Sequence, residues 1–412
     1  MKELALENNP SDVGLRCDAL NRIQTYFDGF VDAGRLGGWL ATVARSGQLV
    51  WTGRGGYQDR ERSLLVRDDT IWRLYSMTKP ITALAAMMLY DEGRFDLNDE
   101  VGRWIEELRD PRIYVSGPAI APVTRPALEP VRVHHLLTHT AGLTYGFQRV
   151  TPVDEMYRAK GYDETRWIWP EGIDLAGAVR DWCSTPLLFE PGSEWNYSVA
   201  TDVIGRLIEI WSGQRLDDFI QERILDPLLM HDTHWYCPEE KLERLSMLYL
   251  NHGGAAVPLE ELAAKATQVP TLLVGGGGLV STAHDFNRFM TMLVRGGELN
   301  AHRFISQRTL SLMTRNHLPQ NLTLADFARD SFKEAGQSGV GYGLGVSVFV
   351  DQARNKSLVS EGSFAWGGAA STYFWVDPVE ELCVGLYSQL LPSSSYPFRR
   401  ALQQFVYTAL DD

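Results

Sequence analysis

A hydroxyl and an amine stand three residues apart in the stretch Tyr75-Ser76-Met77-Thr78-Lys79-Pro80. Residues with this spacing share one face of a helix. Pro80 is tolerated only in the first turn of a helix, and from Ile81 the apolar spacing predicts a helix that ends near Asp91. The stretch therefore predicts that both polar groups lie at the start of one helix.

Ser76 is of a residue type that caps helices. A serine held at a helix N-terminus can act as a nucleophile if a nearby base takes its proton, and backbone N–H groups at that end can stabilise an oxyanion. Lys79 is the nearest candidate base. A serine cap followed by a solvated lysine would produce the same pattern, so other parts of the chain must decide between the two interpretations.

Composition narrows the possible classes of protein. The 412 residues allow a large core in two domains, or in one domain with an insertion. A formal net charge of −13 argues against a nucleic-acid partner, and no apolar run is long enough to span a bilayer. The first ten residues lack an apolar signal core, so we expect a cytoplasmic protein. The cysteines show no metal or redox spacing and are expected to be free, buried thiols: Cys17, Cys183, Cys237 and Cys383.

Strand patterns gather at the two ends of the chain. Residues 12–33 and 398–410 read as helices, residues 39–51 as a hairpin, and residues 342–350, 371–376 and 382–387 as strands. We therefore predict an α+β fold, an α–β sandwich whose antiparallel sheet combines N- and C-terminal strands flanked by helices. A large, mainly helical insertion lies between them. The expected parts are residues 1–75, 76–270 and 271–412, with the helical part beginning at the nucleophile helix.

One irregular stretch, residues 145–169, is unusually aromatic. Such a segment packs its rings onto its own domain or lines an apolar substrate pocket. Tyr145 is the candidate substrate-binding residue in it. The four glycines at 275–278 read as a tight loop.

Six short motifs occur in an order and separation that chance explains poorly. They are residues 76–79 (SMTK), 136–143 (LLTHTAGL), 190–198 (EPGSEWNYS), 227–230 (PLLM), 277–282 (GGLVST) and 366–368 (WGG). From about Gly38 to its end, the chain resembles the serine hydrolases of the penicillin-recognising fold. These include class C β-lactamases, DD-peptidases and family VIII carboxylesterases.

The resemblance implies a role for each motif. Ser76 would be the acylated nucleophile, and Lys79 and Tyr197 would share the general-base and general-acid work. The backbone N–H groups of Ser76 and Ala369 would form the oxyanion hole, with Ala369 on an expected edge strand. The substrate-binding residues would be Trp366, Gly367, Gly368, Tyr145 and Trp195.

Other polar residues are assigned structural roles. His139 is expected to form a structural hydrogen bond. The pairs His134-His135 and His231/His234 lack carboxylate or cysteine partners, so no metal site is predicted. Residues 345–349 (GVSVF) lack the last glycine of a Gly-x-Ser-x-Gly elbow and lie in a predicted strand, so Ser347 is also interpreted as structural.

Two departures from the β-lactamase pattern bear on the substrate. β-Lactamases of this fold have Tyr-x-Asn where this chain has Tyr197-Ser198-Val199, so a side-chain amide is missing. They have Lys-Thr-Gly or His-x-Gly where this chain has Trp366-Gly367-Gly368, and an indole replaces the cation that helps to hold a lactam carboxylate. Family VIII esterases share the Trp-Gly-Gly form, which favours uncharged esters.

The sequence thus predicts a serine carboxylesterase that hydrolyses uncharged, short-chain esters through an acyl-enzyme on Ser76. The expected partner is a small-molecule ester, without nucleic acid, membrane, metal or organic cofactor. An acyltransferase and a β-lactam or amide hydrolase of the same fold are the alternatives. From another class, a non-catalytic binding protein that retains the fold is the remaining alternative.

Overall fold

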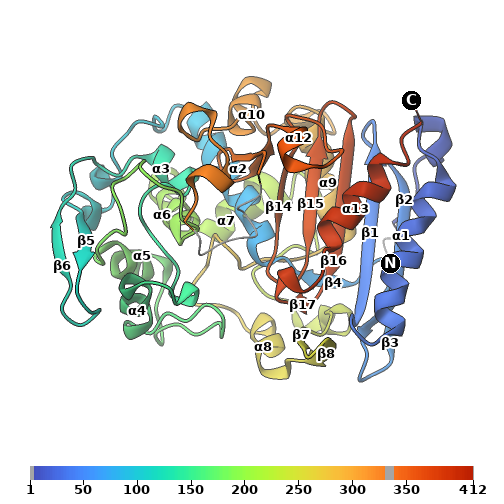
Figure 1. The fold of residues 1–412 in the computed structure, drawn as a ribbon, viewed down its shortest axis with the longest axis horizontal. Coiled ribbons are helices and arrows are strands. Elements are labelled where there is room, and N and C mark those ends of the chain that lie inside the picture. Colours follow the sequence, from blue (N-terminus) through green and yellow to red (C-terminus); the bar gives the residue numbers. More distant parts are fainter. Residues whose placement is uncertain (1–3, 330–337, 412) are drawn as a thin grey trace.

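The computed structural model describes residues 4–329 and 338–411. Its main feature is an antiparallel sheet of eight strands (Figure 1). In spatial order these are β12 (Val340–Tyr342), β13 (Ser347–Phe349), β14 (Phe364–Gly367), β15 (Tyr373–Asp377), β16 (Leu382–Ser388), β1 (Gly38–Arg45), β2 (Gln48–Asp59) and β3 (Leu64–Leu65). β1 pairs with β16 from Trp39 opposite Ser388 to Arg45 opposite Leu382. This pairing confirms that the two ends of the chain share one sheet.

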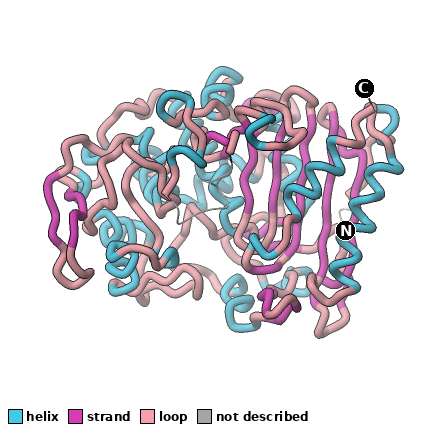
Figure 2. Tube along the Cα trace, in the orientation of Figure 1, coloured by secondary structure: helices cyan, strands magenta, loops and turns pink. Residues whose placement is uncertain are grey.

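Helices cover both faces of the sheet (Figures 1 and 2). α1 (Cys17–Asp32) and α13 (Phe398–Tyr407) contact each other on one face, and α9 (Ala283–Val294) packs against β16, β1 and β15 on the other. α1 buries an apolar stripe, as its helical spacing predicts. On this stripe the Phe27 ring stacks on Trp39, with ring centroids 4.9 Å apart, and lies 5.2 Å from Phe398.

Three local predictions were wrong. The first helix begins at Cys17 and not at residue 12, because Gly14 (φ 70°) ends a short 3₁₀-helix, Pro10–Val13, before it. Residues 342–350 do not form one strand: β12 ends at Tyr342, and the chain turns before β13. All four cysteines are free, but Cys17 is exposed, since it lies at the first turn of α1.

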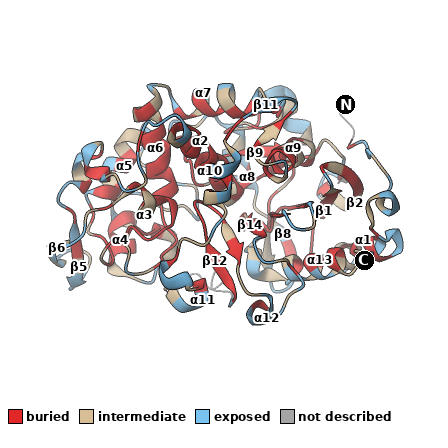
Figure 3. Ribbon diagram, turned by 90° about the horizontal axis from the view of Figure 1, so that it is seen from above, coloured by how far each residue is buried: buried red, intermediate tan, exposed pale blue. Residues whose placement is uncertain are grey.

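The middle of the chain is mainly helical, as predicted. Its helices are α2 (Lys79–Asp91), α3 (Val133–Leu137), α4 (Pro152–Ala159), α5 (Leu175–Cys183), α6 (Ala200–Ser212), α7 (Leu216–Ile220) and α8 (Glu260–Ala264). Two hairpins accompany them, β5 (Arg112–Ser116) with β6 (Val123–Pro126), and β7 (Tyr249–His252) with β8 (Ala255–Pro258). α2 packs against α6, and both are largely buried (Figure 3). The part boundaries at residues 76 and 270 stay predictions.

Further short elements lie in the C-terminal part. They are β10 (Glu298–Leu299), β11 (His302–Arg303), α10 (Gln307–Met313), α11 (Leu324–Phe327), α12 (Gln352–Asn355) and β17 (Leu390–Leu391), which pairs in parallel with β7. In the described part of the chain, no helix is long and apolar enough to cross a lipid bilayer.

A short strand pair positions the serine motif. β4 (Ile71–Arg73) pairs with β9 (Val280–Thr282), which leads directly into α9. Leu74 continues the pairing, because its N–H donates to the Leu279 carbonyl at 2.9 Å. The chain then enters α2, so the motif lies where the sheet part meets the helical part.

Candidate active site

Ser76 lies in a 3₁₀-helix, Tyr75–Thr78, that leads into α2 at Lys79. Pro80 occupies the first turn of α2, as predicted. The interpretation of Ser76 as a helix cap is excluded, because its hydroxyl makes no capping bond and meets side chains of the site instead. Tyr75 adopts φ 46°, a conformation that is costly for a non-glycine residue and that is found at functional turns. This sharp turn sets the direction of the Ser76 side chain.

Lys79 is buried, with 1% of its surface exposed, so a solvated lysine is excluded. Its Nζ lies 3.4 Å from Ser76 Oγ and donates to the Gly276 carbonyl at 2.6 Å. Burial lowers the pKa of Lys79 to about 7, because the charged ammonium loses its hydration, while the Asp202 carboxylate opposes that shift. A substantial fraction of Lys79 is therefore neutral at neutral pH and able to accept a proton.

Tyr197 reaches the same hydroxyl from the segment that precedes α6. Its Oη donates to Ser76 Oγ at 2.6 Å, and Lys79 Nζ lies 4.5 Å from the centre of its ring. His139 packs its ring 5.0 Å from that of Tyr197, and its Nδ1 lies 3.1 Å from Ser198 Oγ. Burial, and then the charge of Lys79, lower the pKa of His139. His139 thus forms the expected hydrogen bond and remains an uncharged support for the tyrosine.

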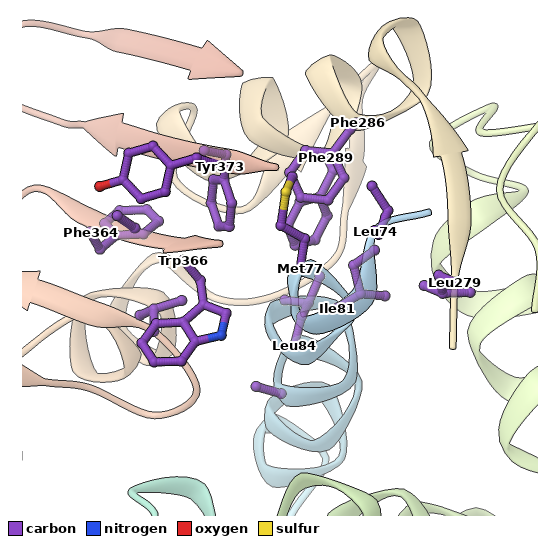
Figure 4. Packing of buried hydrophobic residues seen from close by; sticks show 14 of the residues in the cluster. Leu74, Met77, Ile81, Leu84, Leu279, Phe286, Phe289, Phe364, Trp366 and Tyr373 are labelled. Atoms are coloured by element: carbon purple, nitrogen blue, oxygen red, sulfur yellow. The ribbon is translucent and has the colours of Figure 1, made fainter. Parts of the chain in front are cut away.

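The motif 366–368 faces the serine from the sheet. β14 lies between β13 and β15, so its expected position at an edge was wrong. β13 pairs only with Phe364 and Ala365, however, and Trp366 and Gly367 pair with β15 alone among the described strands. This end of β14 is therefore open toward the serine. Figure 4 shows the Trp366 indole beside the start of α2, where Met77 and Ile81 pack toward α9.

Glycine is required at position 368 by close packing. A Cβ there would lie 2.2 Å from the Leu74 carbonyl oxygen and 2.2 Å from Thr372 Oγ1. Because the two backbones touch, the segment just after β14 lies directly against the segment that leads to Ser76. The first N–H groups of a helix have no partner within it. Ala369 lies in the turn after β14 and not on a strand as expected, and the oxyanion hole of the Ser76 and Ala369 N–H groups stays a prediction.

A cavity of about 500 Å³ opens at Ser76. Aromatic residues dominate its wall on the helical side: Tyr145, Phe147, Trp167, Trp169, Trp182 and Tyr197. Trp366, Gly367, Gly368 and Ala369 form the wall on the sheet side. Tyr145 thus lies where a substrate-binding residue should. The aromatic stretch has both expected roles, because Tyr157 and Tyr162 are buried in the domain and do not line the cavity.

Trp195 was wrongly expected to line the cavity. Its side chain is fully buried and packs 5.8 Å from His139 and 5.4 Å from Tyr342, measured between ring centroids. It supports Tyr197 from behind, where the two rings stack 6.2 Å apart. Ser347 has the structural bond expected of it, donated to the Ala365 carbonyl at 2.8 Å, and it also reaches the cavity wall.

Several residues of the cavity had no role in the sequence interpretation. Asp202 and Gly276 flank Lys79, and Val199 takes the place of the lactamase amide at the wall. Glu164 also lines the cavity; burial raises its pKa to about 7, although N–H groups of Gly146 and Phe147 hydrogen-bond to it. The glycine run at 275–278 could have indicated Gly276, and the five-residue spacing from Tyr197 could have indicated Asp202.

A cation is present at the cavity although the motif 366–368 lacks one. α13 brings Arg399 to the wall, where its Nη2 lies 3.4 Å from the Gly368 carbonyl and its guanidinium 5.2 Å from the centre of the Tyr373 ring. The sequence could not indicate this, because Arg399 is some thirty positions away from the motif. Within residues 4–329 and 338–411, no three His, Cys, Asp or Glu side chains are grouped so as to hold a metal ion.

The chain is similar to several known proteins. The family model described as Beta-lactamase matches residues 23–408. Esterase EstB of Burkholderia gladioli is 32% identical over 411 residues, covering 94% of each chain. Protein Rv1367c of Mycobacterium tuberculosis (strain ATCC 25618 / H37Rv) is 31% identical over 369 residues, covering 88% of each chain. The solved structure of EstCE1, a hydrolase with promiscuous acyltransferase activity, superposes with a TM-score of 0.80 at 24% identity, covering 96% of this chain and 99% of that one.

Proposed function

The chain belongs to the β-lactamase family of serine hydrolases, and from that premise we propose that it is a carboxylesterase that forms an acyl-enzyme on Ser76. The observation that carries the proposal is the contact of one hydroxyl with two proton-handling groups. Tyr197 Oη lies 2.6 Å and Lys79 Nζ 3.4 Å from Ser76 Oγ, at the floor of an aromatic cavity. Nucleophile and base within hydrogen-bond reach are what acyl transfer requires.

In the proposed cycle, Ser76 Oγ attacks the ester carbonyl carbon and its proton passes to the pair Tyr197 and Lys79. The carbonyl oxygen becomes an oxyanion, which the N–H groups of Ser76 and Ala369 stabilise. The carbon–oxygen bond to the alcohol then breaks, and the pair returns a proton to the leaving alkoxide. Water attacks the acyl-Ser76 ester with the same pair as base, which releases the acid and restores the serine.

The proposed substrates are uncharged esters with short acyl chains. Val199 and Trp366 make the two positions that serve lactam recognition apolar, and both line the cavity. EstB, which shares 32% identity over nearly the whole chain, is an esterase. A cavity of about 500 Å³ leaves room for a bulky alcohol group beside a short acyl chain.

A series of p-nitrophenyl esters of rising acyl length, run beside a chromogenic cephalosporin, tests the function. We expect ester cleavage that falls with chain length, little lactam cleavage, and loss of ester cleavage in Ser76→Ala. Mass spectrometry should find the acyl group on the peptide that contains Ser76. Acylation of another peptide, or full activity of Ser76→Ala, contradicts the assignment.

Acyl transfer to an alcohol is the second candidate. The aromatic walls of the cavity favour it, because rings bind an apolar alcohol better than they bind water. Product analysis with added alcohols separates the two: ester products that increase with alcohol concentration indicate transfer. A fluorophosphonate probe that fails to label Ser76 in the folded protein would favour the non-catalytic alternative.

A further inference from the structure

Asp202 is a buried carboxylate next to the site that the proposed cycle does not use. It lies in the first turn of α6, five residues after Tyr197, with 2% of its surface exposed. Its Oδ1 accepts a hydrogen bond from the Gly276 N–H at 2.9 Å. Within the described residues no Lys or Arg nitrogen lies within 4.0 Å of its carboxylate oxygens, so it has no direct ion pair. A buried carboxylate is costly unless charge or hydrogen bonds compensate it.

Gly276 connects this carboxylate to Lys79. The two ends of the glycine are bonded to the two groups, since its carbonyl accepts from Lys79 Nζ at 2.6 Å and its N–H donates to Asp202. A Cβ on Gly276 would lie 2.9 Å from Asp202 Oδ2, 2.9 Å from the Tyr145 hydroxyl and 3.1 Å from Lys79 Nζ. Three polar groups therefore converge on the space beside a glycine that has only a hydrogen there.

We propose that Asp202 is the positioning residue for Lys79: through the Gly276 peptide and its own charge, it holds the amine toward Ser76 and sets the pH above which that amine accepts a proton. This inference rests on the role proposed for Lys79. Asp202 lines the cavity beside Lys79 but takes no proton and forms no bond in the proposed cycle, so it acts through Lys79.

The charges around the pair agree with this arrangement. Burial and then the charge of Lys79 act on the pKa of Asp202 in opposite directions, and burial prevails, so that pKa is raised. The Asp202 charge in turn raises the pKa of Lys79 against the larger effect of burial. The other titratable groups that face the pair or its nearest neighbours are Tyr145, Tyr197, His139, Glu164 and Tyr342. Lys79 is the one Lys or Arg side chain among the pair and these five groups.

The test measures the rate at which a fluorophosphonate labels Ser76 between pH 5 and 10 in the full chain. Asp202→Asn removes the negative charge that favours the protonated form of Lys79. The pH at the midpoint of the acid limb should therefore move down by about one unit, as expected when an opposite charge nearby is lost. The rate on the plateau should fall about tenfold, since the amine is held less well. In Asp202→Glu the charge is kept, so the midpoint should stay with the wild-type value.

Asp285→Asn is the matched control. Asp285 is equally buried in the first turn of α9 and accepts a hydrogen bond from the Asp232 N–H at 2.7 Å, but it lies outside the cavity wall. Its variant should lose stability and keep the midpoint. A midpoint that does not move in Asp202→Asn, or one that moves as far in Asp285→Asn, would overturn the inference. Labelling of Ser76 does not need an ester substrate. A protein that is labelled but cleaves no ester would therefore refute the proposed function without refuting the role of Asp202.

Discussion

Replacing Tyr197 by Phe tests the proton-handling role most directly. The change removes the hydroxyl that donates to Ser76 Oγ at 2.6 Å and keeps the ring, which packs against Trp195, His139 and Trp366. Loss of one hydrogen bond should cost about 1 kcal/mol of stability. Loss of general acid–base catalysis should lower kcat about 10²–10⁴-fold, equivalent to about 3–5 kcal/mol in the barrier. Activity should therefore fall far more than stability.

The matched control is Tyr342→Phe. Tyr342 packs against the same two tryptophans, Trp195 and Trp366, and its buried hydroxyl has no hydrogen-bond partner among the described residues. Its removal should leave kcat unchanged and should not lower the Tm. The assay is p-nitrophenyl ester hydrolysis for kcat and KM, with thermal unfolding of each variant. A Tyr197→Phe variant that keeps kcat within about threefold of wild type, or an equal loss of activity in both variants, would refute the proton-handling role of Tyr197.

Three further outcomes are expected. The kcat/KM of the wild type should fall below about pH 7, because protonation of Lys79 removes the base, and a pH profile measures this. Gly368→Ala should abolish activity and lower the Tm, since its methyl group would lie 2.2 Å from the Leu74 carbonyl, whereas Gly29→Ala, with nothing within 4 Å, should not lower either. Glu164→Gln should raise the Tm more at pH 8 than at pH 5. The folded-state pKa of Glu164 is raised from 4.5 to about 7, so the destabilisation builds up between these two pH values and is complete above about pH 7.

The sequence predicted the parts of the fold that depend on local spacing. The hairpin at β1 and β2, the last helix and the three-residue step from Ser76 to Lys79 all follow from periodicity and turn residues. Pairing of β1 with a late strand followed from the strand patterns at both ends of the chain. The site triad Ser76, Lys79 and Tyr197 came from the resemblance, because no local pattern links residues 121 positions apart.

Local spacing could not predict whether an aromatic ring lines the cavity or packs in the core. Trp195 and Tyr197 are two residues apart and stack on each other, yet only Tyr197 reaches Ser76. The difference depends on Tyr342, which covers Trp195 and comes from β12, about 150 positions later. Likewise, burial of Lys79 depends on Gly276, whose carbonyl reaches it from the loop before β9. Such contacts are properties of the assembled chain.

The burial that prepares Lys79 also bears on the substrate. Lys79 can act as a base near neutral pH because its amine has lost its hydration, a shift that a negative charge nearby would reverse. A lactam carboxylate in the cavity would be such a charge, and Trp366 offers no cation to balance it. Arg399 and Arg400 also line the cavity, but Arg399 already hydrogen-bonds the Gly368 carbonyl and lies over the Tyr373 ring, and Arg400 donates to the carbonyls of Asn355 and Lys356. An uncharged ester leaves Lys79 neutral and needs no such compensation, so the same dry site that activates the base favours the substrate class proposed for it.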